Sequence, residues 1–486
     1  MADIIERTPA VQYKLQLGLA GMVDGPDNVA PVAKRLQQLH AYQAASLSGT
    51  LPIQITSYSA EQDWHNYHDE TYIRGETVRL KLSRPASAFT GIPEKELGCL
   101  NYQDHIPDPD FEIGNCTVDT DQDLMAVTQL NLGEIPHMYL LSISRAGALH
   151  PLAAYPHLEG TVELGVSVDP EESLEIRGDL ILWSIVTEVF QIFVYNWKTG
   201  RIVWESGDWN DDGGSFHLCP YFLDGTHIVV VQNTTISIHE VHPTKQIYDS
   251  LLCELELPTL AMNKLPHGVK SCLQYPPAHS DEAPLFKPDP SLTLLVLRFL
   301  ACSDPNGRVR STCKPFLVLI PVSTMLAQVE RLRRGEAKGP NASVSTSTRC
   351  DARLVPWKEW SPLGACLIEL PSLDANGHES NICTMGSRVL LAPSEITAAN
   401  AKEDIYVLDA HPLATAAHPT PSSSTEPRIV VKKCIENPEF FADPVHNTLP
   451  CRAVRLVPTD ALATEREGLW NLRLGQDCLR STRYCL

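Results

Sequence analysis

Long uncharged apolar runs are missing from this chain of 486 residues. Nothing in it approaches the roughly 20 consecutive apolar residues of a membrane-spanning helix, so no transmembrane helix is predicted. The opening sequence, MADIIERTPAVQYK, has acidic residues at positions 3 and 6 and no apolar core segment, so a signal peptide is not predicted. The last cysteine is second from the end, not fourth as prenylation requires. These absences favour a cytoplasmic or nuclear protein without a membrane partner.

Positive charge is also scarce. Lys and Arg total 39 against 59 Asp and Glu, which gives a formal net charge of -20. A field of this sign repels phosphate backbones and anionic lipid headgroups, so neither nucleic acid nor a membrane surface is an expected partner. A local basic group at Arg331, Arg333 and Arg334 does not reverse this balance.

Closely paired cysteines are absent. The 14 cysteines are spread from Cys99 to Cys485 and never form a C-x-x-C motif. Without a signal peptide, this pattern favours a reduced compartment in which most thiols are small core side chains.

Catalytic and nucleotide-binding motifs are missing as well. The chain has no G-x-x-x-x-G-K-[ST], strand-linked G-x-G-x-x-G, H-E-x-x-H or G-x-S-x-G sequence. His239 and His242 are three apart in an expected strand and therefore face opposite sides, so they are not expected to share a metal. We predict no catalytic, cofactor-binding or metal residue, no cofactor and no enzyme activity.

Two acidic segments have part of the spacing of a calcium-binding loop. They lie at 119–123 and 208–213, and each lacks the bidentate glutamate that such a loop needs at its twelfth position. We interpret both as turns between strands.

The first fifty residues carry a helical pattern. Four apolar side chains fall on one helical face: Val32, Leu36, Leu39 and Tyr42. They predict an amphipathic helix over 29–46, with Asp27 or Asn28 as its cap and Pro31 in its first turn. A second ordered piece is predicted over 9–19, so residues 1–50 form an N-terminal helical segment.

From residue 51 onward the texture is one of short apolar strands and turns. The predicted strands are 78–82, 138–144, 180–183, 190–204 (a hairpin), 226–231, 235–241, 292–300, 316–320, 388–392, 404–408 and 451–457. Strong helical periodicity is missing between them, which favours an antiparallel all-β fold over βαβ units.

The strands recur at a loose interval. Comparable apolar strands begin at Asp123, Asp179, Thr226 and Leu292, which are 56, 47 and 66 residues apart. Propeller blades of four strands repeat at about 40–50 residues. The excess length lies in polar, proline-rich stretches near 276–290, 334–349 and 412–427, which we predict to be disordered loops. We therefore predict, over 51–486, an all-β, WD-like β-propeller of about six to eight irregular blades, preceded by the short N-terminal helical segment.

The segment 195–200, YNWKTG, is the clearest blade marker. WD repeats close their third strand with Trp-Asp, followed by a Thr-Gly turn, and Tyr-Asn takes that place here. An ordinary hairpin in a β-sandwich is the alternative. Four tryptophans gather nearby and are interpreted as blade packing, with an interface cluster as the alternative: Trp183, Trp197, Trp204 and Trp209.

Two stretches together resemble a large family of fungal F-box proteins. The N-terminal RTPAVQYKLQLGLAGMVDGP with the helix AKRLQQLHAYQAA is similar to the segment after the F-box, and DLILWSIVTEVFQIFVYNWKTGRIVW to the propeller-like region. The similarity extends to about residue 300. It implies a subunit that recruits substrates to a cullin-RING ubiquitin ligase. The F-box itself, which binds the ligase adaptor, is missing from this chain, so the adaptor is not an expected partner.

The expected function is that of a non-catalytic protein-binding β-propeller, with a protein partner held by loops on one propeller face. The resemblance implies a substrate-recruiting subunit related to the F-box proteins of cullin-RING ubiquitin ligases. Two alternatives remain open. One is a propeller-fold hydrolase with clustered carboxylates near the central channel, and the other is a structural scaffold without ligase coupling.

Overall fold

The protein is built mainly from short β-strands. The computed structural model describes residues 8–26, 30–59, 64–68, 71–76, 79–102, 105–106, 113–129, 134–161, 171–186, 190–206, 219–247, 250–262, 264–276, 283–302, 313–335, 353–370, 380–393, 405–413, 429, 431–456 and 470–485.

Seven sheets of three to five strands occupy these ranges, and we number them as blades in chain order. Blade 1 comprises β3 (Trp64–His68), β4 (Thr71–Glu76), β5 (Arg79–Arg84) and β6 (Lys95–Asn101). Blade 2 comprises β7 (Cys116–Asp119), β8 (Leu124–Gln129), β9 (His137–Ser142) and β10 (His157–Glu159). Blade 3 comprises β11 (Glu171–Arg177), β12 (Leu180–Val186), β13 (Phe190–Asn196) and β14 (Arg201–Glu205). Blade 4 comprises β15 (Cys219–Phe222), β16 (His227–Val231), β17 (Thr235–Glu240), β18 (Leu251–Glu256) and β23 (Arg353–Val355).

The last three blades complete the ring. Blade 5 comprises β19 (Leu265–Leu273), β21 (Leu294–Cys302), β22 (Lys314–Pro321) and β24 (Cys366–Glu369). Blade 6 comprises β25 (Ser380–Met385), β26 (Arg388–Pro393), β27 (Tyr406–Ala410) and β30 (Cys451–Arg455). Blade 7 comprises β31 (Trp470–Leu474), β32 (Leu479–Cys485) and the N-terminal strand β2 (Ile53–Ser59).

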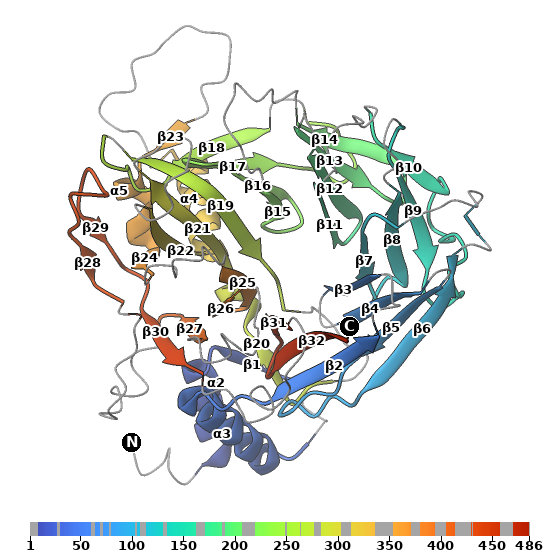
Figure 1. The fold of residues 1–486 in the computed structure, drawn as a ribbon, viewed down its shortest axis with the longest axis horizontal. Helices are drawn as coiled ribbons and strands as arrows, with labels where there is room; N and C mark the ends of the chain where they lie inside the picture. The colour runs from blue at the N-terminus through green and yellow to red at the C-terminus, as the bar shows by residue number, and fades with distance from the viewer. Residues whose placement is uncertain are drawn as a thin grey trace, which may run out of the picture.

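The blades stand around a central axis, with first strands such as β7, β11 and β15 nearest the centre (Figure 1). Neighbouring strands within the blades pair in antiparallel fashion, as in β11–β12–β13–β14, except for the parallel pairs β18–β23 and β2–β32. The predicted all-β propeller is confirmed, and its seven blades in the described ranges fall within the predicted six to eight.

The repeat seen in the sequence corresponds to the second strand of successive blades. The strands predicted to begin at Asp123, Asp179, Thr226 and Leu292 are β8, β12, β16 and β21. All residues of β8 and β16 are buried. A second strand packs against neighbouring blades on both of its faces, so its sequence is a continuous apolar run without alternation.

The blade marker lies at the end of a third strand, as the WD pattern requires. Asn196 ends β13, and its side-chain oxygen accepts a hydrogen bond from the Thr199 N–H at 2.9 Å. Gly200 adopts a φ of 69°, which closes the turn into β14. Local hydrogen bonding of the Asn side chain thus supplies the turn that Asp supplies in a standard repeat.

The N-terminal segment forms two helices, α2 (Pro9–Leu19) and α3 (Val32–Ser48). The predicted helix over 29–46 is confirmed, although it begins at Val32 with Pro31 as its N-cap and has no side-chain cap. The predicted caps at 27 and 28 lie outside the described residues. None of the helices in the described ranges is both long enough and apolar enough to cross a membrane.

A two-stranded ribbon joins these helices to the ring. Strand β1 (Met22–Asp24) pairs with β20 (Phe286–Pro288), which lies in the connection between β19 and β21 and within the range 276–290 predicted as a loop. Phe286 is fully buried, and its ring lies 5.9 Å from that of Tyr42 on α3. The helices therefore pack on blades 6 and 7 through a shared apolar cluster. The other two predicted loops, 334–349 and 412–427, lie almost wholly outside the described residues.

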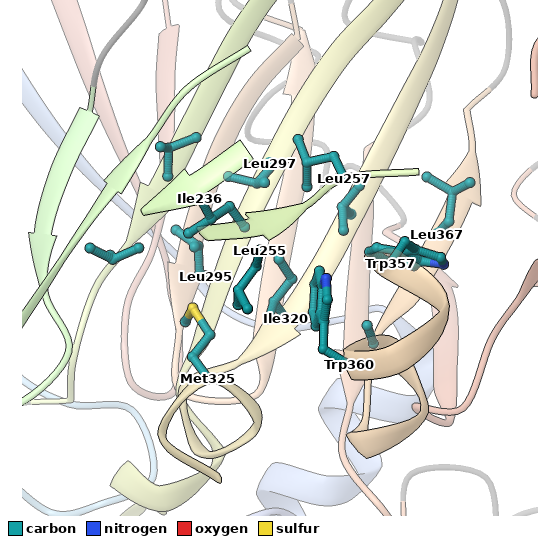
Figure 2. Packing of buried hydrophobic residues seen from close by; sticks show 14 of the residues in the cluster. Ile236, Leu255, Leu257, Leu295, Leu297, Ile320, Met325, Trp357, Trp360 and Leu367 are labelled. Atoms are coloured by element: carbon teal, nitrogen blue, oxygen red, sulfur yellow. The ribbon is translucent and has the colours of Figure 1, made fainter. Parts of the chain in front are cut away.

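A helical insertion between β22 and β24 was missed by the sequence analysis. It contains α4 (Val322–Arg333) and α5 (Trp357–Trp360). Figure 2 shows Met325 and Trp360 lying among apolar side chains of the neighbouring strands, including Leu255 and Ile320. The same insertion adds β23 to blade 4, in parallel with β18. The expectation that no helical periodicity follows residue 51 is therefore wrong at α4.

Two thiols in the described ranges are joined as a disulfide. Cys302 and Cys313 flank the connection between β21 and β22. Cys116, Cys253 and Cys366 are buried thiols, in agreement with their interpretation as small core residues.

Candidate functional site

A cavity of about 400 Å³ lies where the first strands of the blades end. Its walls include the turns between first and second strands at Asp119, Gly178 and Asp477, in blades 2, 3 and 7. Thr71 at the start of β4 in blade 1 and Tyr275 just after β19 in blade 5 also line the cavity. Because the first strands are nearest the axis, these turns converge at one mouth of the central channel. We call this space the channel-mouth cavity, and its volume is that of a typical ligand pocket.

The ribbon from the N-terminal segment closes one side of the cavity. Lys287 and Pro288 of β20 line it, and Pro290 continues the wall. The cavity is thus bounded by the ring and by the element that carries α2 and α3.

Arg84 is the most unusual side chain of the cavity. It ends β5, is only 8% exposed, and its Nη1 atom has no hydrogen-bond partner within the described residues. A buried polar group without a partner costs free energy, and a buried charge costs more. The folded protein therefore has, at the channel mouth, a cationic donor without a hydrogen-bond partner in the part of the chain that the structure describes.

A second guanidinium is held by an aromatic platform. The Arg177 guanidinium lies 3.8 Å from the centre of the Tyr275 ring, a cation–π distance. The Tyr275 hydroxyl donates a hydrogen bond to the Leu223 carbonyl, and burial raises the pKa of this hydroxyl above its ordinary value. The ring is therefore fixed between blades 4 and 5 and remains neutral.

Asp477, the buried acid of the cavity, already accepts hydrogen bonds from another segment of the chain. One carboxylate oxygen of Asp477 accepts hydrogen bonds from Ser87 Oγ at 2.9 Å, Phe89 N at 2.6 Å and Thr90 N at 3.0 Å. These bonds tie the turn of blade 7 to the segment after β5. Asp477 thus has a structural role and does not neutralise Arg84 through any ion pair in the described ranges.

The first acidic loop is a hairpin turn, as predicted. Asp119 accepts hydrogen bonds from the backbone N–H groups of Asp121 and Gln122, while Asp123 accepts from the Ser144 N–H in the turn after β9. The two carboxylates therefore serve different turns. The second acidic loop and Trp209 lie outside the described residues.

The other singled-out side chains are structural. Trp183, Trp197 and Trp204 are at most 4% exposed, which confirms their interpretation as blade packing. His239 is buried with its ring centre 5.0 Å from that of Trp204, and burial lowers its pKa to about 4. His242 instead accepts a hydrogen bond from the Thr244 N–H in the following turn.

No residue of the cavity was predicted from the sequence to belong to a functional site, because the lining side chains come from distant parts of the chain. Arg84, Arg177, Tyr275 and Lys287 come from separate blades and from the ribbon, so no local motif contains two of the cations. The only available signal was positional, because Arg177 directly precedes the turn into a predicted second strand.

No protein-family model and no curated protein matches the sequence. Among solved structures, the WD40 domain of Toxoplasma gondii coronin is similar at 7% identity and TM-score 0.36, covering 74% of this chain and 69% of that one. The C-terminal WD40 domain of Sif2 gives 10% and 0.31, covering 74% and 82%. BamB from Moraxella catarrhalis gives 11% and 0.32, covering 71% and 84%.

The fold is shown by the sheets of this chain, namely by the ring of blades, the strand pairing within each blade and the third-strand marker at 195–200. The described ranges form a seven-bladed, WD-like β-propeller.

Proposed function

We propose that this propeller is a non-catalytic protein-binding module whose partner places an acidic side chain in the channel-mouth cavity. WD-like propellers commonly serve as rigid scaffolds that present loops to other proteins. The observation that carries the proposal is the buried, unpartnered Nη1 of Arg84 at the cavity wall. A partner carboxylate there would accept a charge-assisted hydrogen bond from this Nη1 and offset the free-energy cost of leaving it unpartnered.

The unpartnered donor at the cavity favours an acid over a base. Three cations, Arg84, Arg177 and Lys287, and three acids, Asp119, Asp121 and Asp477, line the cavity. Asp119 and Asp477 accept hydrogen bonds from their own turns and walls, whereas Nη1 of Arg84 has no hydrogen-bond partner in the described residues. The formal net charge of the whole chain is -20. An acidic segment is thus repelled by most of the surface and attracted at the channel mouth, which fixes its binding orientation.

The engagement of those carboxylates does not favour the hydrolase alternative. A glycosidase-type mechanism uses a pair of carboxyl groups facing each other across a substrate. Here the Asp477 oxygen already accepts three hydrogen bonds, so this group is committed to holding the wall.

The finer part of the proposal is kinship with substrate-recruiting F-box proteins, in the cytoplasm or nucleus. The support is the sequence resemblance of the α2–α3 segment and of the strands around 195–200. Co-precipitation of the tagged chain with a ligase adaptor would support this part, because it would reveal an equivalent of the F-box that the sequence does not show. Recovery of other proteins without the adaptor would favour a scaffold without ligase coupling.

Arg84→Met tests the cavity. A randomised peptide display library panned on the wild-type protein should yield sequences enriched in Asp and Glu. The selected peptides should bind the variant at least about tenfold more weakly, since losing one partner of a buried charge pair costs about 2 kcal/mol or more. Fluorescence anisotropy with the labelled peptides measures this difference.

Arg79→Met is the matched control, because Arg79 is the exposed residue at the other end of the same strand. It should leave peptide affinity unchanged. The free protein carrying Arg84→Met should be at least as stable as wild type, because the change removes an uncompensated buried charge. Equal peptide binding by wild type and Arg84→Met would contradict the proposal, as would a library that yields no acidic preference.

A further inference from the structure

Three metal-ligating side chains meet at the outer edge of blade 2, far from the channel mouth. They are His137 on β9 and His157 and Glu159 on β10, and their ligand atoms all lie within 4.8 Å of one another. Strand β10 is the outermost strand of its blade, at the rim of the ring (Figure 1). The cluster is therefore reachable from solvent.

Strand register brings the three residues together. His157 and Glu159 are two apart on β10 and so project from the same face of the sheet. In the antiparallel pairing with β9, Glu159 lies directly opposite His137, and His157 lies opposite Tyr139. Directly opposed side chains have Cβ atoms roughly 5 Å apart, which is within reach of a shared ion.

The backbone of this hairpin is fixed at the cluster. The Tyr195 hydroxyl donates to the Glu159 carbonyl at 2.6 Å, which ties β10 to blade 3. The Gly160 N–H donates to the Pro136 carbonyl at 2.9 Å and holds the end of β10 beside the start of β9. Ligands carried on rigid strands bind an ion without a further ordering cost for the backbone.

The polar atoms of the cluster are incompletely satisfied. His157 Nε2 lies 3.1 Å from Glu159 Oε1, while His137 Nδ1 is buried and has no hydrogen-bond partner among the described residues. The two imidazole rings meet edge to face with centres 5.3 Å apart. Two nitrogens and a carboxylate oxygen thus share one small volume.

We propose that His137, His157 and Glu159 form a Zn²⁺ site. Two imidazoles and one carboxylate are a zinc donor set, with water in the fourth position of the tetrahedron, whereas Mg²⁺ and Ca²⁺ prefer all-oxygen sites. The ligand atoms of a zinc tetrahedron are roughly 3.3 Å apart. The ligand atoms of the three residues now lie within 4.8 Å of one another, and small rotations of the half-exposed His157 and exposed Glu159 side chains would bring them to this spacing.

The test uses the full chain, freed of any affinity tag and of metal, at pH 7.5. Calorimetric titration with Zn²⁺ should show a site that His157→Gln and Glu159→Gln each weaken by at least about tenfold. Co²⁺ should give visible bands of a tetrahedral ion in wild type that are lost in both variants. Mg²⁺ should give no binding heat at the same concentration.

His40→Gln is the matched control, because His40 is exposed on α3, at a different part of the ring. It should bind Zn²⁺ as wild type does, and the side-by-side titrations cancel zinc held by other histidines and thiols. Glu159→Asp keeps the carboxylate and should retain more affinity than Glu159→Gln. Circular dichroism without metal verifies the fold of each variant. Wild-type affinity and cobalt bands in His157→Gln and Glu159→Gln would overturn the proposal.

Discussion

At the scale of single residues, Glu172 shows how burial sets a proton equilibrium inside a blade. This side chain of β11 accepts hydrogen bonds from Thr128 Oγ1 at 2.8 Å and from Trp183 Nε1 at 2.5 Å. Burial nevertheless dominates over these bonds and raises the pKa of the carboxyl group to about 7. The folded protein therefore keeps a proton that the unfolded chain releases near pH 4.3.

This difference makes folding depend on pH. Between about pH 4.5 and pH 7 the folded state binds more protons than the unfolded state, so the contribution of Glu172 to stability falls as pH rises. Glu172→Gln removes that contribution. From pH 4.5 to pH 8 the stability of the variant should improve relative to wild type by on the order of 2 kcal/mol.

Denaturant unfolding at several pH values measures this change. Glu205→Gln is the matched control, because Glu205 is exposed on the last strand of the same blade. Parallel stability curves for wild type and Glu172→Gln across the range would show that the carboxyl group is not protonated in the folded protein.

The burial of single charged side chains was the property that the sequence predicted least well. Arg84 and Glu172 look like ordinary surface charges in the sequence, because each lies near a strand end beside polar residues. The surroundings of Arg84 include blade 7, whose turn is bonded to the segment after β5, and Glu172 is bonded to Thr128 of blade 2 as well as to Trp183 of its own blade. Local pattern carries no information about such neighbours.

At the scale of elements, α3 meets the ring through its C-terminus. Gly49 ends the helix with a φ of 69°, and a Cβ atom placed there would lie 2.3 Å from the carbonyl oxygen of Arg455 at the end of β30. Only a residue without a side chain fits both the left-handed conformation and this close approach.

Gly49→Ala should therefore destabilise the protein by about 2–4 kcal/mol, with contributions from the left-handed backbone and from overpacking against blade 6. Chemical denaturation monitored by tryptophan fluorescence measures this loss.

Gly335 provides the comparison, since it follows α4 with a φ of 67° and has open space where its Cβ would be. Gly335→Ala should show the backbone cost alone, about 1–2 kcal/mol. Equal losses at the two positions would mean that α3 does not pack closely on β30.

Elements were largely predictable where one apolar run makes one strand. The runs at 226–231 and 235–241 became β16 and β17 within one residue at each end. Helix α4 was missed because its apolar residues, Val322, Met325, Leu326 and Val329, directly follow the strand β22. The spacing of three, four and seven residues was present there and would have identified the helix.

At the scale of the whole molecule, the ring is closed by a strand that follows the N-terminal helices and by the last strand of the described chain. Strand β2 pairs with β32, and the register from Ile53 opposite Leu479 to Ser59 opposite Cys485 is parallel. Antiparallel pairing holds the other strands of the blades together, apart from β23. Closure therefore joins residues more than 400 positions apart, as in Cys478 Sγ to Gln54 Oε1 at 3.4 Å.

Gln54→Pro should open this junction. The Leu479 N–H donates to the Pro52 carbonyl at 2.9 Å, and in a parallel ladder the Gln54 N–H then points back at β32. Proline removes that donor and leaves its acceptor on β32 unpaired, at a cost of about 1–3 kcal/mol. Hydrogen–deuterium exchange should rise together in residues 51–56 and 471–480, while blades 3 and 4 keep their protection.

Gln54→Ala distinguishes the backbone from the side chain, because it removes only the hydrogen bonds of the Gln54 amide with Ala86 and Cys478. It should leave exchange at 471–480 close to that of wild type. An increase confined to 51–56 in the proline variant would mean that β32 stays paired without β2.

The fold class of the whole molecule was predictable from the sequence, but the strand pairings between distant segments were not. The recurring second strands were enough to predict a propeller of six to eight blades. Nothing local indicated that β2 would pair with β32, or that β20 would leave blade 5 to pair with β1. Such pairings depend on the geometry of the closed ring, which forms only after distant segments meet.

The ribbon of β1 and β20 has a mechanical consequence. Phe286 packs against the N-terminal helices, and Lys287, the next residue of the same strand, lines the cavity. The pairing of β1 with β20 thus sets how the backbone of α2 lies relative to the channel mouth. A displacement of β20 would act on the N-terminal helices and on the cavity wall together, because neighbouring residues of one strand serve both.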